Sequence, residues 1–126
     1  MSNYQVIKTC EYPLATGINT TISSNNFLNA FTPYGDASLI IMANMYANIT
    51  QLAKDEQIAE VFDMIGKNTA KLLSRQTEIK VGAQATLIVL KAKDAVAAIR
   101  TNSQAIAGFK NGEQTFCNEA ARICFE

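Results

Sequence analysis

The sequence predicts an all-α protein with two long helices, an irregular N-terminal arm and a short C-terminal helix. From residue 36 onward, apolar residues recur at the three- and four-residue spacing typical of helices. Small residues, which permit close helix packing, are abundant between residues 70 and 98. Residues 1–35, in contrast, are rich in Asn, Thr and Ser and contain both prolines. We therefore expect three segments: the arm (1–35), a helical core that polymerises (36–107) and a C-terminal segment (108–126).

The first long helix is expected over about residues 36–65. Asp36 follows the Pro-Tyr-Gly sequence at the end of the arm and is a good N-cap, because its carboxylate can accept from the free amides of the next turn. Gly66 can end the helix in a left-handed C-cap. The side chains expected to pack against another helix are Leu39, Met42, Tyr46 and Ile49.

The second long helix is expected over about residues 68–107. Gly82 inside it would cost about 1 kcal/mol relative to alanine, so close helix packing is the expected reason for this glycine. Gly108 and Asn111-Gly112 then interrupt the pattern, and the residues after them can form the short C-terminal helix. The chain either folds back at Gly66 into an extended hairpin or continues through it. Two helices of this length leave much apolar surface exposed, which favours an obligate oligomer or polymer.

The composition argues against an enzyme. The chain has 11 basic and 11 acidic residues and no histidine, which excludes Ser-His and Cys-His catalysis and histidine-ligated metals. A net charge of zero gives no electrostatic attraction for nucleic acid and does not oppose self-association. No phosphate-binding glycine motif, zinc motif or calcium loop occurs. We therefore expect no cofactor, no metal site and no catalytic residue.

The charges are sorted around Gly66. Four acidic residues precede it and three basic residues follow it: Asp55, Glu56, Glu60, Asp63, Lys67, Lys71 and Arg75. If the chain reverses at Gly66, the acidic group faces the basic group in one consistent register. If the helix is continuous, Asp63–Lys67 is the one favourable i, i+4 pair. Alternatively, both groups are simply solvated.

The three cysteines do not form a recognisable disulfide framework. They are Cys10, Cys117 and Cys124, an odd number without a CxxC pair. Cys117 and Cys124 would share a helix face but lie roughly 10 Å apart along it, beyond disulfide reach. They are therefore candidates for thiols that crosslink two chains, or they are reduced and idle. The N-terminus shows no basic segment followed by an apolar run, so no signal peptide is expected.

Several motifs resemble the R-body (Reb-type, "killing trait") structural proteins of bacteria. Gly35-Asp36-Ala37 precedes an uncharged helix that ends in Met42-Ala43-Asn44-Met45-Tyr46, and residues 68–86 are similar to the helix that follows in that family. The resemblance implies a subunit that polymerises, alone or with paralogous co-subunits, into an insoluble ribbon in the bacterial cytoplasm. Such a ribbon extends on a trigger such as a pH change, and its contact with membranes is mechanical.

In such a polymer, the acidic cluster offers a hypothesis for the trigger. Without histidine, a mildly acidic signal would act through clustered carboxylates, because clustering raises their pKa values. Protonation of Asp55, Glu56, Glu60 and Asp63 would weaken their pairing with the basic group and shift a contact between subunits.

Two other classes stay open. Subunits of type III secretion filaments have a similar apolar helix with a Met-Tyr pair, here Met45-Tyr46. A small helical adaptor or chaperone would be a discrete, soluble dimer.

Overall fold

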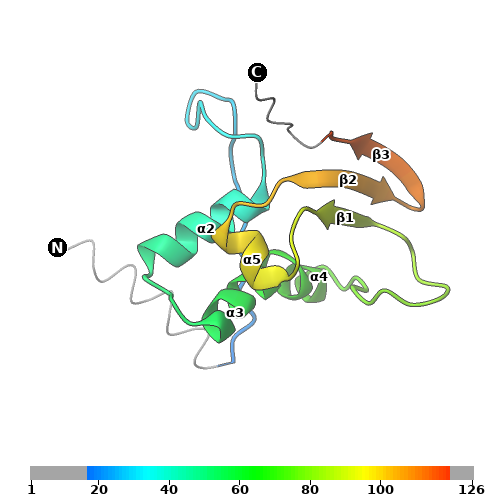
Figure 1. Ribbon diagram of the computed structural model, residues 1–126, viewed down its shortest axis with the longest axis horizontal. Helices are drawn as coiled ribbons and strands as arrows, with labels where there is room; N and C mark the ends of the chain where they lie inside the picture. Colours follow the sequence, from blue (N-terminus) through cyan, green and yellow to red (C-terminus); the bar gives the residue numbers. More distant parts are fainter. Residues whose placement is uncertain (1–16, 120–126) are drawn as a thin grey trace, which may run out of the picture.

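The computed structural model describes residues 17–119, which form a cluster of helices and a separate small sheet. The elements in chain order are α2 (Leu39–Ile49), α3 (Asp55–Ile65), α4 (Lys67–Leu72), β1 (Leu87–Leu90), α5 (Ala95–Arg100), β2 (Ala105–Lys110) and β3 (Glu113–Cys117). The strands form an antiparallel sheet in the order β1-β2-β3, which extends away from the helices (Figure 1). The fold is therefore mixed α/β, and the predicted all-α hairpin of two long helices is wrong.

The first predicted helix is divided into α2 and α3. Gln51 adopts a left-handed conformation (φ 57°) directly after the helix end at Thr50. The amide of Leu52 then donates to the carbonyl of Ala47 at 2.9 Å, which closes α2 in a Schellman motif. Asp36 also does not cap α2. Its side chain accepts from the amide of Ser38, and α2 begins only at Leu39.

The second predicted helix is wrong over most of its length. Ser74 (φ 52°) ends α4 in a second Schellman motif, and residues 73–86 contain neither helix nor strand. The four apolar residues of β1 follow, and two of them, Ile88 and Val89, are β-branched types that favour strands. α5 then begins at Ala95, and the carboxylate of its N-cap, Asp94, accepts from the amide of Ala97 at 2.7 Å. Only six residues of this region, Ala95–Arg100, are helical after β1.

Up to residue 119, the predicted C-terminal helix is replaced by the β2–β3 hairpin, and residues 120–126 of that prediction lie outside the described residues. Asn111 (φ 56°) and Gly112 (φ 87°) form its two-residue loop, and Lys110 pairs with Glu113 across it. Two consecutive left-handed residues match the right-handed twist of the flanking strands, and Asn-Gly is the sequence that adopts them most readily. The dipeptide that appeared to interrupt a helix is therefore a hairpin turn.

The hydrophobic core lies between α2, α3 and α5. Its buried members are Ala43, Ala47, Ile58, Val61, Met64 and Ile99. The side-chain amide of Asn44 donates to the carbonyl of Ile99 at 2.8 Å and joins α2 to the end of α5. The buried residues of α2 are Ile40, Ala43 and Ala47. The predicted packing residues Leu39, Met42 and Tyr46 are half-buried, and Tyr46 packs against the core.

Two other residues predicted to pack between helices lie elsewhere. Ile49 is exposed at the end of α2. Gly82 lies in a turn of the segment before β1, with φ 84° and no heavy atom near the position of an added Cβ. This glycine therefore permits a left-handed backbone and not a close helix contact.

The segment before α2 is held on the helices by a reciprocal pair of asparagines. The Asn19 side chain donates to the carbonyl of Asn68 at 3.0 Å, and the Asn68 side chain donates to the carbonyl of Thr20 at 2.9 Å. The amide of Ile22 donates to the carbonyl of Met64 at 3.2 Å.

Within residues 17–119, no helix is both long and apolar enough to cross a bilayer.

Candidate functional site

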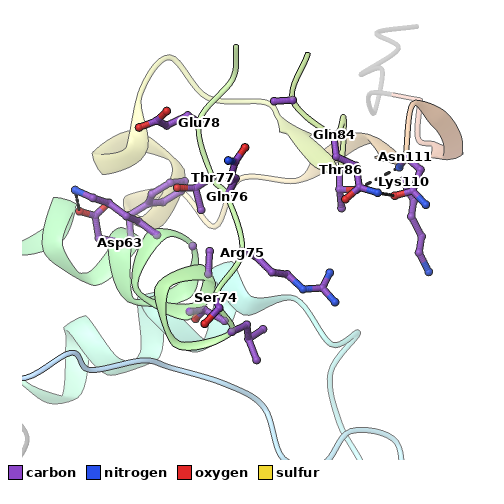
Figure 2. Close-up of a pocket in the computed structure, with 17 residues that line it drawn as sticks. Asp63, Ser74, Arg75, Gln76, Thr77, Glu78, Gln84, Thr86, Lys110 and Asn111 are labelled. Atoms are coloured by element: carbon purple, nitrogen blue, oxygen red, sulfur yellow. Dashed lines mark hydrogen bonds and ion pairs between the residues drawn. The ribbon is translucent and has the colours of Figure 1, made fainter. Parts of the chain in front are cut away.

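A large cleft lies between the α3–α4 region and the β2–β3 turn. It has a volume of about 1070 Å³ and is walled by the end of α3, by α4 and the chain that follows it, and by the residues on either side of the turn. Figure 2 shows Arg75 projecting from the chain that follows α4 and Lys110 lying beside Asn111 on the other wall.

Hydrogen bonds to the hairpin turn fix one wall of this cleft. The chain leaves α4 at Ser74 and returns at residues 84–86, where the carbonyl of Ala85 accepts from the amide of Gly112 at 2.8 Å. The Gln84 side chain donates to Oδ1 of Asn111 at 2.7 Å, and the amide of Asn111 donates to Oγ1 of Thr86 at 3.2 Å. Asn111 thus sets the turn and also anchors the incoming segment.

The cleft has both apolar and polar lining residues, with charges of both signs. Asp63 and Lys67 form an ion pair at 3.5 Å on one wall. Glu78, Arg75 and Lys110 also line the cleft, all of them exposed to solvent. No group of three carboxylate or thiol ligands that could hold a metal occurs in residues 17–119. The cleft can therefore offer hydrogen bonds and two free cationic side chains, and it contains no recognisable acid–base pair.

A second, smaller groove of about 280 Å³ lies between residues 23–38 and α2. Its apolar side chains include Phe27, Ile41 and Met45, all of which are exposed. It contains one carboxylate, Asp36, whose Oδ1 is already bonded to the amide of Ser38.

The acidic and basic residues around Gly66 are not brought together as two facing groups. Asp55 pairs with Arg100 of α5 at 2.8 Å, and Asp63 pairs with Lys67. Glu56 and Glu60 form no ion pair within the described part of the chain, nor do Lys71 and Arg75. Their assignment to a pH-sensitive contact stays a prediction.

Of the three cysteines, Cys117 alone falls inside the described range. It is a free, exposed thiol at the end of β3. Cys10 and Cys124 lie outside the described residues, so the crosslinking role of the three thiols stays a prediction.

The sheet is the feature that the sequence reasoning missed. Ile88 pairs with Gly108, and Gly108 pairs with Phe116, so one line of residues crosses all three strands on the same face. The signal for it was available: Asn111-Gly112 with β-favouring residues on both sides is typical of a hairpin.

Helices packed on one another beside a three-stranded antiparallel meander place the chain in the mixed α/β class. The same arrangement occurs in 5-methylcytosine deaminase from Klebsiella pneumoniae. The structure of that enzyme with 5-fluorocytosine superposes with a TM-score of 0.81 and 17% identity, over 92% of this chain and 29% of the deaminase. Its complex with phosphonocytosine gives 0.81 and 17%, over 93% and 29%.

At this identity, the similarity shows the fold alone. The chain spans less than a third of the length of the deaminase that it matches. No protein-family model matches the sequence. A search of characterised proteins by sequence also finds no match.

The similarity overturns the R-body assignment. An R-body subunit was expected to consist of long helices, whereas nearly the whole chain follows the mixed α/β fold of a deaminase segment. The ribbon-forming, pH-extending, membrane-disrupting function that depended on that resemblance is therefore wrong as well. The Gly35-Asp36-Ala37 and Met45-Tyr46 motifs were too short to identify a family.

Proposed function

We propose that this chain is a non-catalytic, supporting part of a deaminase-like protein. In that protein, the reacting groups come from polypeptide outside this chain. The observation that carries the proposal is the unequal coverage of the match. The deaminase fold accounts for 92% of this chain, whereas this chain accounts for 29% of the deaminase. A segment of that size is more suited to complete and support a catalytic body than to act alone.

The side chains of the chain support a role without catalysis. With no histidine in the sequence, it cannot supply a histidine ligand to a metal or a histidine general base. Of the carboxylates that line the large cleft, Asp63 is half-buried and Glu78 is exposed, and each is already paired with a lysine.

The partners in this proposal are proteins. Equal numbers of acidic and basic residues give the chain no net attraction for nucleic acid, and exposed apolar side chains on the sheet favour contact with another apolar surface. The bacterial cytoplasm expected from the sequence stays part of the proposal.

The test is an activity assay on the purified chain. Ammonia release from 5-methylcytosine would be measured with Zn²⁺ or Fe²⁺ added, beside the Klebsiella deaminase as the positive control. We expect no release above the buffer that contains metal alone, and no stoichiometric metal by elemental analysis. Turnover by the chain itself, lost in an Asp63→Asn or Glu78→Gln variant, would overturn the proposal.

A further inference from the structure

The turn of the β2–β3 hairpin contains two groups that can react with each other. Asn111 carries a side-chain amide, and the backbone nitrogen of Gly112 is the next one along the chain. Because glycine has no side chain, this nitrogen is unhindered and its backbone is flexible. The sequence contains no other Asn-Gly pair. This dipeptide is therefore the position at which a spontaneous modification of the chain is chemically easiest.

The reaction is deamidation through a cyclic imide. The Gly112 nitrogen loses its proton to a base in solution and attacks Cγ of Asn111. A bond forms between that nitrogen and Cγ, and the bond from Cγ to Nδ2 breaks, so that Nδ2 takes up a proton and leaves as ammonia. Water then opens the ring at either carbonyl. One opening gives an aspartate, and the other gives an isoaspartate, in which the backbone runs through Cγ.

The structure holds the reacting groups on the segment that precedes β1. The Gly112 amide donates to the carbonyl of Ala85 at 2.8 Å, so the proton that must leave is held in a hydrogen bond. Oδ1 of Asn111 accepts from the Gln84 side chain at 2.7 Å and from Oγ1 of Thr86 at 3.4 Å (Figure 2). The amide of Asn111 also donates to Thr86 Oγ1 at 3.2 Å. Residues 84–86 thus oppose both the deprotonation and the rotation that the attack requires.

This protection can be released without unfolding the protein. Residues 84–86 are exposed, as are Asn111 and Gly112, so water can replace each of these hydrogen bonds. The segment of residues 73–86 that leads to them contains neither helix nor strand. The buried core lies between α2, α3 and α5 and does not include these residues. Exposed segments with few buried contacts open at a small fraction of the global unfolding free energy.

We propose that Asn111 is a deamidation site that residues 84–86 protect, so that its rate of modification depends on how often this segment leaves the turn. The product changes the cleft that this turn lines. A carboxylate at position 111 adds a negative charge beside Lys110 (Figure 2). An isoaspartate lengthens the backbone of the two-residue turn by one carbon, which disturbs the pairing of Lys110 with Glu113.

The first test compares the full chain with a synthetic peptide of residues 105–117 at neutral pH. The peptide contains β2 and β3 without residues 84–86, and an isolated hairpin is marginally stable in water. Trypsin cleaves after Lys110 and Arg122, so the product is followed by mass spectrometry in the fragment of residues 111–122. Protein isoaspartate methyltransferase labels the isoaspartate form. We expect the full chain to react more slowly than the peptide, and equal rates would overturn the proposal.

The second test removes the protecting side chains one at a time. Gln84→Ala removes the donor to Oδ1 of Asn111, and Thr86→Val removes the hydroxyl but keeps the branched shape. The net contribution of one hydrogen bond changes a population roughly 2- to 13-fold, and each variant should deamidate faster by about that factor. Gln114→Ala is the matched control, because this exposed side chain of the same hairpin donates to the carbonyl of Phe116. Its rate should equal that of the unmodified sequence.

Hydrogen exchange of the Gly112 amide, measured by NMR, distinguishes this mechanism from general loosening. Exchange also requires release of the amide from Ala85, so it should accelerate by the same factor as deamidation in each variant. Unchanged deamidation in both variants would overturn the proposal, and so would an equal acceleration in Gln114→Ala. The comparison with the peptide uses the unmodified sequence, so it decides the result even if a variant fails to fold.

Discussion

Gly108→Ala tests how the sheet accommodates Phe116. A Cβ at position 108 would lie 2.2 Å from Cε1 of Phe116, 2.7 Å from Cδ1 and 2.9 Å from Cζ. Carbon atoms in contact prefer about 3.5–4.0 Å, so the ring must withdraw by roughly 1.5 Å. Overpacking of this kind costs about 1–3 kcal/mol. Alanine regains about 0.5–1 kcal/mol over glycine within a strand, and we expect a net loss of about 1–2 kcal/mol.

Urea denaturation followed by circular dichroism measures this loss, and a double-mutant cycle assigns it to the ring. In a Phe116→Ala background the clash is absent, so Gly108→Ala should be neutral or stabilising there. Gly66→Ala is the control for the glycine substitution itself, because a Cβ at that position would make an ordinary 3.7 Å contact with the carbonyl of Phe62. If Gly108→Ala destabilises the protein equally with and without the Phe116 ring, the steric reasoning is refuted.

Three further predictions concern the helices. Asp94→Ala removes the side chain that caps α5 and should cost about 1 kcal/mol by urea denaturation; an unchanged midpoint would show that the cap is not needed. Met64→Ala removes a fully buried side chain and should lower the free energy of unfolding by about 2–5 kcal/mol. Leu72→Ala, at a 64% exposed position, should change it by no more than about 0.5 kcal/mol. Equal effects of the two variants in thermal denaturation would contradict the assigned core. The Asp55–Arg100 pair is 68% and 49% exposed, so a double-mutant cycle should give a coupling of about 0–1 kcal/mol that falls with salt; a larger, salt-independent coupling would contradict this account.

The sequence predicted the existence of α2 and α3, and local capping explains why it did not predict their limits. Their apolar spacing is helical, as expected, but the pattern continues through residues 50–54, where the chain turns. The turn depends on left-handed Gln51 and on a hydrogen bond from Leu52 to Ala47. Glutamine is a good helix former, so its propensity argues against the conformation that the Schellman motif imposes.

The region after Gly66 was wrongly predicted as helix because its small and apolar residues fit both the helical period and the strand period. The four residues of β1 form an apolar run too short to distinguish a strand from a buried helix. Asn111-Gly112 was the feature that could have decided between them. A hairpin there requires strands on both sides, which excludes the predicted C-terminal helix and the end of the second predicted long helix.

The candidate site was less predictable than the fold. The sequence drew attention to charges near Gly66, yet Asp55 pairs with Arg100, which is 45 residues away and belongs to a helix that was not predicted as a separate element. The line of Ile88, Gly108 and Phe116 across the sheet depends on the strand register. Register follows from pairing over long sequence distances and cannot be read from any one segment.

The position of Ile99 in the core determines when this protein can fold during synthesis. Its partners on α2 and α3 leave the ribosome first, but Ile99 follows Met64 by 35 residues and comes after β1. The emerging chain must therefore keep Ala47, Val61 and their neighbours exposed while residues 66–94 are made. A nascent chain that stops before α5 would leave this part of the core exposed, and transiently exposed hydrophobic surface makes incomplete chains prone to aggregation.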